Sequence, residues 1–452
     1  MRLVTWLYII VFFTVSIVNI LAESSENLKV DLSNRNMDNK EFFKNYQRQI
    51  DVQNIKELNL SGNALNSFVD CATTLHSLEV LDLSRNSLDK FYFLCKDETY
   101  ILRFLNVSHN QLEYIDERTL NNKTVKLETL DVSWNLLSGL NDTMFQHMEV
   151  LEKLYLSHNP IGDNMDEFVF ENLTTLKHLE LKNISVSFFY TKMFENLLKL
   201  VFLDLSLNPI EVIPVLPMTL EILDLSQTNI YRFDSFKLPR LQVLRLNNMQ
   251  NLSSVNLNDF EKCTKLNSLS LRSSKKLKQL TTLAPMDHLL PELRYLDIQD
   301  CALEKLGKEL QSMIEEVKIF KFQNNPWYCD CKMEWILMVN TSHNLRNQIV
   351  CHSPALVQRK LIGEIPVDEL QCLSDTYNYA PILWICIVTV GLCLIIVSII
   401  LIFRSSITNW VIRRKTSRDS VSYTNVVESS NDLVKILNDS DLQERFEECI
   451  KP

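Results

Sequence analysis

The sequence predicts an α/β solenoid, in which short parallel strands stack side by side along one curved sheet. The segments LETLDVSWNLL and LEKLYLSHNPI, which begin at Leu127 and Leu151, share the template L-x-x-L-x-L-x-x-N-x-L at an interval of 24 residues. The inner L-x-L alternation directs two leucines to one face of a strand. One copy cannot bury that face alone, so successive copies must stack about 4.8 Å apart and share a core.

The template recurs along most of the chain. Copies begin at Ile55, Leu78, Leu102, Leu127, Leu151, Leu176, Leu200, Leu220, Leu241, Leu266, Leu293 and Val317. Most intervals are 23 to 25 residues; the two that end at Leu220 and Leu241 are shorter, and the one that ends at Leu293 is longer. A period of this length is the signature of a leucine-rich repeat solenoid, a horseshoe of about a dozen units.

The ninth template position combines a polar side chain with an expected buried location. Seven copies place asparagine there: Asn63, Asn86, Asn110, Asn135, Asn159, Asn208 and Asn325. An amide can satisfy backbone groups where the chain turns between stacked units. The other copies carry Ile184, Thr228, Met249, Ser274 and Cys301, so the half after Leu220 is expected to be less regular.

The repeats, together with a cysteine-rich segment that follows them, resemble the extracellular leucine-rich repeat family, as in Toll-like receptor ectodomains and related adhesion receptors. The resemblance covers about residues 55–372. The run NPWYCDC from Asn325, followed by Trp335, Cys351 and Cys372, looks like the C-terminal cysteine cap of that family. The resemblance implies the disulfides Cys329–Cys351 and Cys331–Cys372. Zinc binding by these four cysteines is the alternative, but Cys-x-Cys followed by wide gaps favours disulfides.

Four other cysteines lie within the repeats. Cys71 and Cys95 fall 16 and 17 residues into consecutive copies, where stacking would bring them to about 5 Å from each other. We therefore expect a disulfide between them; two free buried thiols are the alternative. Cys263 and Cys301 fall at unlike positions two units apart, which predicts unpaired core residues.

Two apolar segments predict how the chain is placed in a membrane. Arg2 and the apolar run up to Ala22 indicate a secretory signal peptide at 1–22, although the length of the run leaves an uncleaved anchor as the alternative. Residues 381–403 contain no charged side chain and are long enough to span a bilayer. Basic residues follow this second run, so the positive-inside rule predicts a type I plasma-membrane protein with extracellular repeats.

These features divide the chain into consecutive segments. The prediction is a capping segment at 23–54, repeats at 55–324, a cysteine-rich cap at 325–372, a juxtamembrane segment at 373–380, a transmembrane helix at 381–403 and a largely disordered cytoplasmic tail at 404–452. Eight N-glycosylation sequons in the predicted ectodomain agree with secretion: Asn59, Asn106, Asn122, Asn141, Asn172, Asn183, Asn251 and Asn340.

The sequence contains none of the common catalytic signatures. It has no Walker A loop, Gly-x-Ser-x-Gly elbow or His-Glu-x-x-His motif, and only six glycines. We therefore expect no enzymatic activity, no cofactor and no metal site. The net charge of −10 argues against general nucleic-acid binding.

The outward face of the sheet is the expected binding surface. Template positions 3, 5, 7 and 8 are predicted to face outward, and exposed aromatic side chains grouped on a rigid surface are candidate hot spots. The candidate ligand-binding residues are Phe104, His109, Trp134, Tyr155, His158, Phe202 and Leu207. The alternative is that an N-terminal segment or a glycan covers them. Glycans on Asn59 and Asn106 would obstruct the first three units and leave residues 127–225, or the flank, to a protein ligand.

The tail offers one signalling motif. Tyr423 lies in the run VSYTNV, which resembles phosphotyrosine motifs that an SH2-containing cytoplasmic adaptor would bind. The sequence as a whole predicts a cell-surface receptor or co-receptor for an extracellular protein ligand, acting alone or as a homo- or heterodimer. A cell-adhesion protein and a non-signalling decoy or innate-immune regulator are the alternatives.

Overall fold

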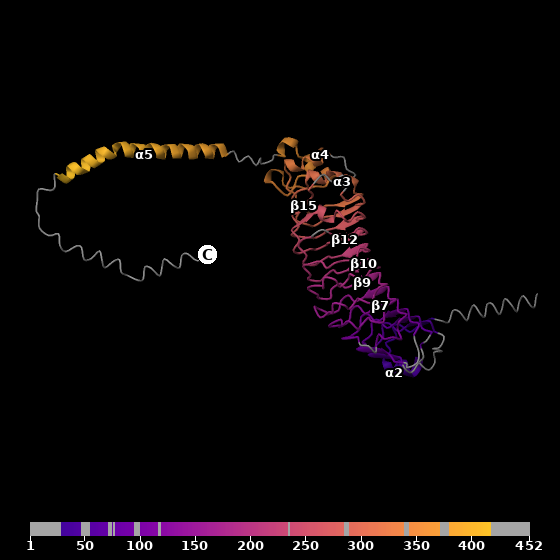
Figure 1. Cartoon of the computed structure of the whole chain (residues 1–452). Helices are drawn as coiled ribbons and strands as arrows, with labels where there is room; N and C mark the ends of the chain where they lie inside the picture. The colour runs from indigo at the N-terminus through magenta and orange to yellow at the C-terminus, as the bar shows by residue number, and fades with distance from the viewer. Residues whose placement is uncertain are drawn as a thin grey trace, which may run out of the picture. The chain divides into compact units, whose positions relative to one another are not determined.

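The computed structural model describes residues 29–46, 55–70, 75, 77–94, 100–115, 119–233, 236–283, 289–338, 343–370 and 379–416. The chain divides into two compact units, Met1–Cys372 and Leu373–Pro452. The first unit contains the strands, and the second contains one long helix (Figure 1).

A parallel sheet of thirteen short strands runs through the first unit in chain order. Its strands are β1 (Lys29–Asp31), β2 (Glu57–Asn59), β4 (Val80–Asp82), β6 (Phe104–Asn106), β7 (Thr129–Asp131), β8 (Lys153–Tyr155), β9 (His178–Glu180), β10 (Phe202–Asp204), β11 (Ile222–Asp224), β12 (Val243–Arg245), β14 (Ser268–Ser270), β16 (Tyr295–Asp297) and β17 (Ile319–Lys321). Each of the twelve template copies supplies one strand, including the less regular copies after Leu220. The predicted solenoid is therefore confirmed.

The thirteenth strand comes from the predicted capping segment. Strand β1 pairs in parallel with β2, with Val30 opposite Leu58. Helix α2 (Asn39–Glu41) and the π-helix η2 (Phe42–Tyr46) follow it. The chain thus covers the open edge of the first repeat with a strand of its own.

Short elements occupy the other side of the solenoid. Strands β3 (Ser67–Asp70) and β5 (Lys90–Phe93) form one parallel pair, and β13 (Ser254–Asn256) and β15 (Gln279–Thr281) form another. The 3-10 helices η3 (Leu257–Phe260) and η4 (Lys308–Leu310) and helix α3 (Gln311–Glu316) complete this side. The template contains no strand signal at these positions, so the sequence did not indicate these pairs.

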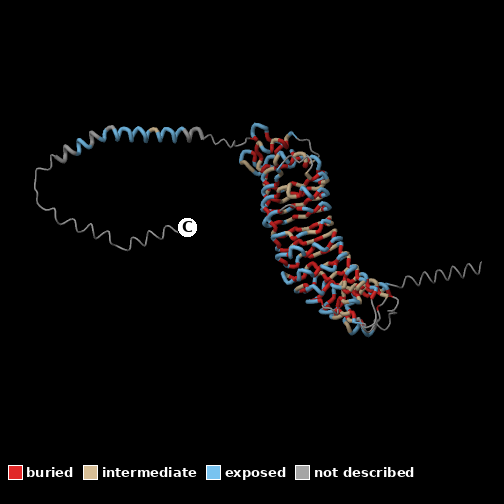
Figure 2. The backbone as a smooth tube through the Cα atoms, in the orientation of Figure 1, coloured by how far each residue is buried: buried red, intermediate tan, exposed pale blue. Residues whose placement is uncertain are grey.

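The leucines of the template form one continuous core (Figure 2). Leu130, Leu154 and Leu179 occupy the centres of neighbouring strands and are fully buried. Below them, the stacked rings of Phe145, Phe170 and Phe194 form a buried column that passes through three repeats. Stacking buries these apolar surfaces, which is the main source of stability in a repeat fold.

The asparagines of the ninth position connect neighbouring repeats. The Nδ2 of Asn110 donates to the carbonyls of Val107 in its own turn (2.9 Å) and Leu83 in the preceding one (3.0 Å), and its Oδ1 accepts the Leu88 amide at 2.9 Å. The other template asparagines make equivalent bonds, which confirms the expected role. At Thr228, Ser274 and Cys301 a hydroxyl or thiol supplies part of this role; the Thr228 hydroxyl, for example, donates to the Leu225 carbonyl at 2.8 Å. Ile184 and Met249 have no such group.

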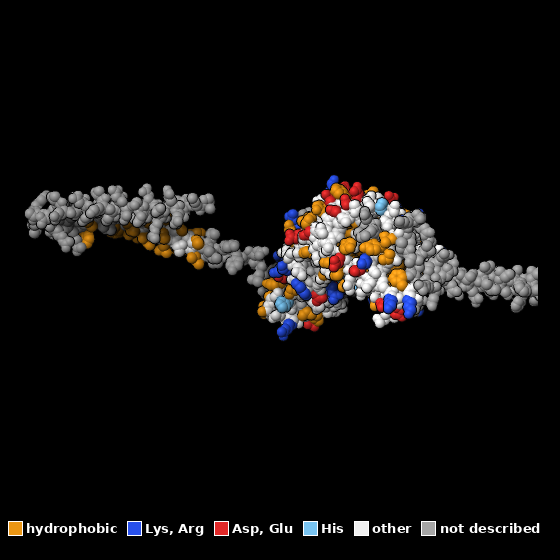
Figure 3. All heavy atoms as spheres, turned by 90° about the horizontal axis from the view of Figure 1, so that it is seen from below, with side chains coloured by type: hydrophobic (Ala, Val, Ile, Leu, Met, Phe, Trp, Pro, Cys, Tyr) orange, Lys and Arg blue, Asp and Glu red, His pale blue; other side chains and the backbone are white. Residues whose placement is uncertain are grey.

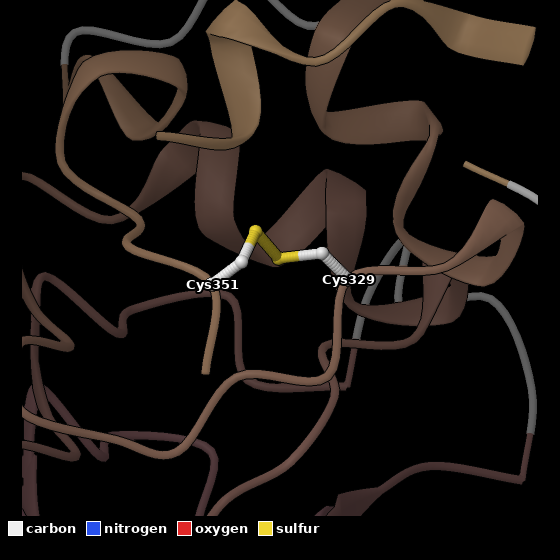
Figure 4. Close-up of a disulfide and its surroundings, with 2 residues drawn as sticks. All are labelled: Cys329 and Cys351. Carbon is white, nitrogen blue, oxygen red and sulfur yellow. A yellow bond between two sulfur atoms is a disulfide. The ribbon is translucent and has the colours of Figure 1, made fainter. Parts of the chain in front are cut away.

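The cysteine-rich cap closes the C-terminal end of the solenoid. It contains η5 (Cys331–Met333), α4 (Trp335–Met338), η6 (Leu345–Asn347), η7 (Ala355–Val357), η8 (Ile362–Glu364) and η9 (Val367–Glu369). A disulfide joins Cys329 to Cys351, the pairing that the family resemblance implies (Figure 4). The Trp335 indole donates to the Leu306 carbonyl at 3.0 Å and so fastens the cap to the last repeats.

The other cysteines of the repeats and the cap fall into three groups. Cys331 is disulfide-bonded, whereas its expected partner Cys372 lies outside the described residues, as do Cys71 and Cys95. Cys263 and Cys301 are free and buried in the core, and burial raises the pKa of each thiol to about 11. Such thiols remain protonated and act as small apolar core residues.

The second unit is helix α5 (Tyr379–Thr416). Its stretch Trp384–Leu401 has a mean hydropathy of 3.0 and is long and apolar enough to cross a membrane. The helix continues through residues 404–416, the start of the segment for which we predict a largely disordered cytoplasmic tail. Residues 404–416 contain no glycine or proline, so no residue interrupts the helix after the apolar stretch. Residues 1–22 and Tyr423 lie outside the described residues.

Candidate binding surface

Three aromatic side chains stack on one another immediately after strands β6, β7 and β8. The ring centroids of His109 and Trp134 are 5.2 Å apart, and those of Trp134 and His158 are 3.8 Å apart. The interplanar angles are 11° and 14°, so the indole lies nearly parallel between two imidazoles. The Trp134 side chain is nevertheless 49% exposed. We call His109, Trp134 and His158 the aromatic ladder.

The backbone conformation at template position 8 produces this ladder. His109, Trp134 and His158 have φ values of 54°, 55° and 60°, in the left-handed region that costs a side-chain-bearing residue about 1 kcal/mol or more. The same region recurs at this position in every copy, from Gly62 (φ 67°) to Asn324 (φ 61°). A turn repeated in this way places position-8 side chains of consecutive units next to one another, and aromatic residues there must stack.

A second aromatic group lies on the strands themselves. The ring centroids of His178 and Phe202 are 4.1 Å apart with an interplanar angle of 4°, and those of Tyr155 and His178 are 4.9 Å apart. The His178 Nε2 also lies 2.8 Å from Oε1 of Glu180. We call Tyr155, His178 and Phe202 the strand cluster.

The structure joins most of the predicted binding residues into these two groups. His109, Trp134 and His158 form the ladder, and Tyr155 and Phe202 belong to the strand cluster. Phe104 is half-buried on β6, opposite Thr129, and has no ring contact with a described residue in either group. Leu207 occupies position 8 two units beyond His158, with Asn183 between them.

His178 is a site residue that the sequence analysis missed. It occupies position 3 of its repeat, in register with Phe202 of the next repeat. A search of position 3 for aromatic neighbours in consecutive copies would have found it. Apart from His109, which follows β6, the stacked rings lie in the segment between β7 and β10, the part of the sheet to which glycans on Asn59 and Asn106 would confine a ligand.

A column of carboxylates runs between the two aromatic groups at template position 5. It contains Asp131, Glu180, Asp204 and Asp224, with Tyr155 between the first two. The Oδ1 of Asp204 accepts the Ser206 amide at 2.8 Å. The aspartates of other repeats accept an amide in the same way. Part of the column therefore stabilises the turn after each strand and is not specific to ligand binding.

Burial changes the protonation chemistry of this surface. It raises the pKa of Asp131 and of Asp204, and it is the main reason that the pKa of Tyr155 is raised. Burial, with the nearby charges of Lys182 and His109, lowers the pKa of His158. The surface therefore holds negative charge that solvent stabilises only incompletely.

One part of the expected outward pattern is wrong. Position 7 was expected to face outward, but Ser84, Ser108, Ser157, Ser206 and Ser226 are buried there. Two of their hydroxyls accept an amide of the next repeat: Ser157 Oγ from Lys182 at 3.2 Å and Ser226 Oγ from Asn247 at 3.1 Å.

The sequons differ in how they meet this surface. Asn59 and Asn106 are half-buried strand residues whose Oδ1 atoms accept the amides of Ser61 and Ser108, each at 3.0 Å. Asn183 is exposed, and its Nδ2 lies 3.0 Å from Nδ1 of His158, at the end of the aromatic ladder. The remaining described sequon residues, Asn122, Asn141, Asn172 and Asn251, are exposed, and Asn340 lies outside the described residues.

An exposed aromatic ladder requires that no glycan on Asn183 shields Trp134. Ser185→Ala removes this sequon but keeps the asparagine, so oxidation of Trp134 in hydroxyl-radical footprinting of protein made in animal cells should match that of the parent. Thr174→Ala removes the exposed sequon of Asn172 and serves as the control. An increase of about twofold or more in Ser185→Ala alone would show that a glycan at Asn183 covers the ladder.

The thirteen-stranded sheet, the asparagine bonds and the cysteine cap define a leucine-rich repeat protein. The leucine-rich repeat family model matches residues 101–161, which contain the whole aromatic ladder. The chain belongs to this family.

Several curated relatives carry similar repeats. Toll-like receptor 7 of Mus musculus is 25% identical over 344 residues, which cover 72% of this chain and 31% of the receptor. Toll-like receptor 2 of Mus musculus is 25% identical over 339 residues, covering 70% of this chain and 38% of the receptor. Lumican of Oryctolagus cuniculus is 31% identical over 172 residues, covering 38% of this chain and 85% of that sequence. The chain thus spans about a third of the length of these Toll-like receptors.

Solved structures resemble the chain over similar lengths. A TLR13–ssRNA13 complex has 24% identity and a TM-score of 0.49, and it covers 68% of this chain and 53% of that chain. The functional domain of InlJ from Listeria monocytogenes has 18% identity and a TM-score of 0.46, and it covers 68% of this chain and 69% of that chain.

Proposed function

We propose that this chain is a cell-surface receptor or co-receptor that binds an extracellular protein ligand through the aromatic ladder and the strand cluster. The observation that carries the proposal is the state of Trp134, which is 49% exposed and yet held between two imidazoles. A large aromatic side chain that is already fixed loses little conformational entropy on binding, which is the property of an interface hot spot. The proposed activity is recognition without catalysis.

The surroundings of the ladder support a protein ligand. The strand cluster and the carboxylates lie on consecutive short strands of one hydrogen-bonded sheet, and the ladder residues follow three of these strands directly, so their spacing is fixed. One face of the molecule also carries hydrophobic side chains with acidic and basic side chains around them (Figure 3), and the two aromatic groups combine apolar rings with nearby carboxylates. An apolar centre with a polar rim is the usual composition of a protein interface.

The membrane arrangement forms part of the proposal. Helix α5 supplies one apolar stretch of sufficient length, and Arg404, Arg413 and Arg414 follow it. The Cys329–Cys351 disulfide precedes it and requires an oxidising compartment. Both features support extracellular repeats, a cytoplasmic C-terminus and glycosylation at the sequons.

Trp134→Ala is expected to abolish ligand binding. In proximity labelling from the ectodomain on living cells, the labelling of one or more surface or secreted proteins should fall about tenfold or more. This is the size of effect expected for a hot spot. Phe188→Ala is the matched control, because Phe188 is also 49% exposed but lies away from both aromatic groups. An unchanged label pattern in Trp134→Ala, at equal surface expression, would contradict the proposal.

Three outcomes in cells separate the receptor from its alternatives. Loss of signalling on Tyr423→Phe supports a receptor that recruits a cytoplasmic adaptor. Aggregation of cells that express the chain would identify an adhesion protein instead. Full activity after deletion of residues 417–452 would identify a decoy or regulator that sequesters its ligand.

A further inference from the structure

The carboxylate column differs along the sheet in how its charge is balanced. Toward the C-terminal repeats, a basic residue on the next strand lies close to each of two aspartates: Arg245 is 3.7 Å from Asp224, and Lys321 is 3.9 Å from Asp297. The fold therefore neutralises this part of the column internally.

The carboxylates beside the aromatic groups have no such partner. Asp131 uses Oδ1 for both the amide (2.9 Å) and the hydroxyl (2.6 Å) of Ser133, and Asp204 uses Oδ1 for the Ser206 amide. Neither carboxylate forms an ion pair with a described basic residue. Burial raises the pKa of Asp204, and the charge of Lys182 offsets this only in part, without an ion pair between the two.

The third carboxylate of this group is only partly satisfied. Oε1 of Glu180 lies 2.8 Å from Nε2 of His178, and Oε2 has no hydrogen bond to any residue that the structure describes. Glu180 and Asp204 occupy paired positions on β9 and β10, so their backbones are about 4.8 Å apart. Two adjacent, half-buried carboxylates thus present oxygen atoms that are open to an external donor.

Aromatic rings border these oxygens on two sides. His178 and Phe202 lie at position 3 of the same strands, and Tyr155 is paired with Glu180 from the preceding strand. The aromatic ladder ends at His158, one repeat before Glu180, and Asn183 and Leu207 occupy position 8 of the two repeats that hold the carboxylates. A guanidinium group matches both features, because it donates two parallel hydrogen bonds to a carboxylate and stacks on an aromatic face. A lysine ammonium forms the ion pair but cannot stack, and a phosphate or nucleic acid would be repelled.

From this charge complementarity we infer that the ligand docks a positively charged segment on this surface, with an arginine side chain placed over Glu180 and Asp204 and against the rings of the strand cluster. The inference rests on the proposed function and adds the chemistry of the partner. The occupant is a segment of an extracellular protein.

Peptide probes test this inference on the full chain in detergent micelles. Biotinylated (Gly-Ser-Arg)4, (Gly-Ser-Lys)4 and (Gly-Ser-Glu)4 are compared by biolayer interferometry. We expect the arginine peptide to bind at least about fivefold more tightly than the lysine peptide, and the glutamate peptide not to bind. Equal affinity of the arginine and lysine peptides would overturn the inference, because it would show charge attraction without stacking.

Glu180→Gln is the decisive variant. It removes the charge but keeps an oxygen acceptor for His178. The affinity for the arginine peptide should fall about tenfold. Glu195→Gln removes an equal charge from an exposed residue on the other side of the solenoid and should leave affinity unchanged. Asp204→Asn is unsuitable, because an asparagine two residues before Ser206 would create a new glycosylation sequon. Equal affinities in Glu180→Gln and Glu195→Gln would overturn the inference.

The two proposals can fail separately. If Trp134→Ala changes the proximity labels while Glu180→Gln leaves the arginine peptide bound, the surface binds a ligand of different chemistry. If Trp134→Ala leaves the labels unchanged, the proposed function itself is wrong, whatever the peptides do.

Discussion

Asn208→Ala is expected to lower the free energy of unfolding by about 3–5 kcal/mol, because it would leave several buried backbone groups without partners at about 1–3 kcal/mol each. The Nδ2 of Asn208 donates to the carbonyls of Leu181 (2.7 Å) and Leu205 (3.0 Å), and its Oδ1 accepts the Ile184 amide at 3.0 Å. The side chain is fully buried, so water cannot replace these bonds. The loss also weakens the coupling between two neighbouring repeats, on which a solenoid depends.

Urea unfolding of the full chain in detergent, followed by tryptophan fluorescence, measures this effect. Thr228→Val is the matched control, since Thr228 occupies the same template position but makes one bond to a carbonyl, that of Leu225. Thr228→Val should lower the free energy of unfolding by about 1 kcal/mol. Similar losses in the two variants would show that the amide does not connect the repeats as described.

Phe170→Ala is expected to have a comparable effect for a different reason. The Phe170 ring is fully buried in the column between Phe145 and Phe194, with centroid distances of 6.3 and 6.0 Å. Truncation leaves a cavity where three repeats meet. It should lower the free energy of unfolding by about 3–5 kcal/mol.

Phe168 provides the control for this cavity. It is two residues away, 59% exposed, and its truncation to alanine should change stability by less than about 0.5 kcal/mol. The same urea titration compares both variants. A small loss for Phe170→Ala would mean that the neighbouring repeats collapse into the space and that the column is not rigid.

The arrangement of strands followed from local spacing. In each copy the leucines at positions 4 and 6 fix which face of the strand is buried, and the interval between copies fixes the stacking partner. This reasoning extended to the irregular copies, such as the one that forms β17, because an Ile-Phe-Lys-Phe run still alternates. Composition likewise placed an apolar span in what proved to be α5.

The binding surface depended on contacts between residues about 24 positions apart. Position in the template identified Trp134 and both histidines of the ladder as neighbours. Their parallel stacking follows from the left-handed backbone at position 8, and the residue types at that position do not predict this conformation. The pairing of His178 with Phe202 required the strand register together with the side-chain conformations. The burial of the position-7 serines likewise depended on the packing of the next repeat.

The sequence by itself determined the solenoid, its register, its asparagine bonds and the cysteines of its cap, because a periodic pattern of leucines has one efficient way to become buried. Only the tertiary structure decided that Trp134 is held between two rings and that Asp224 is neutralised by Arg245 while Glu180 and Asp204 are left open. Burial depends on the period of a pattern, whereas these contacts depend on side-chain directions and on atoms contributed by separate repeats.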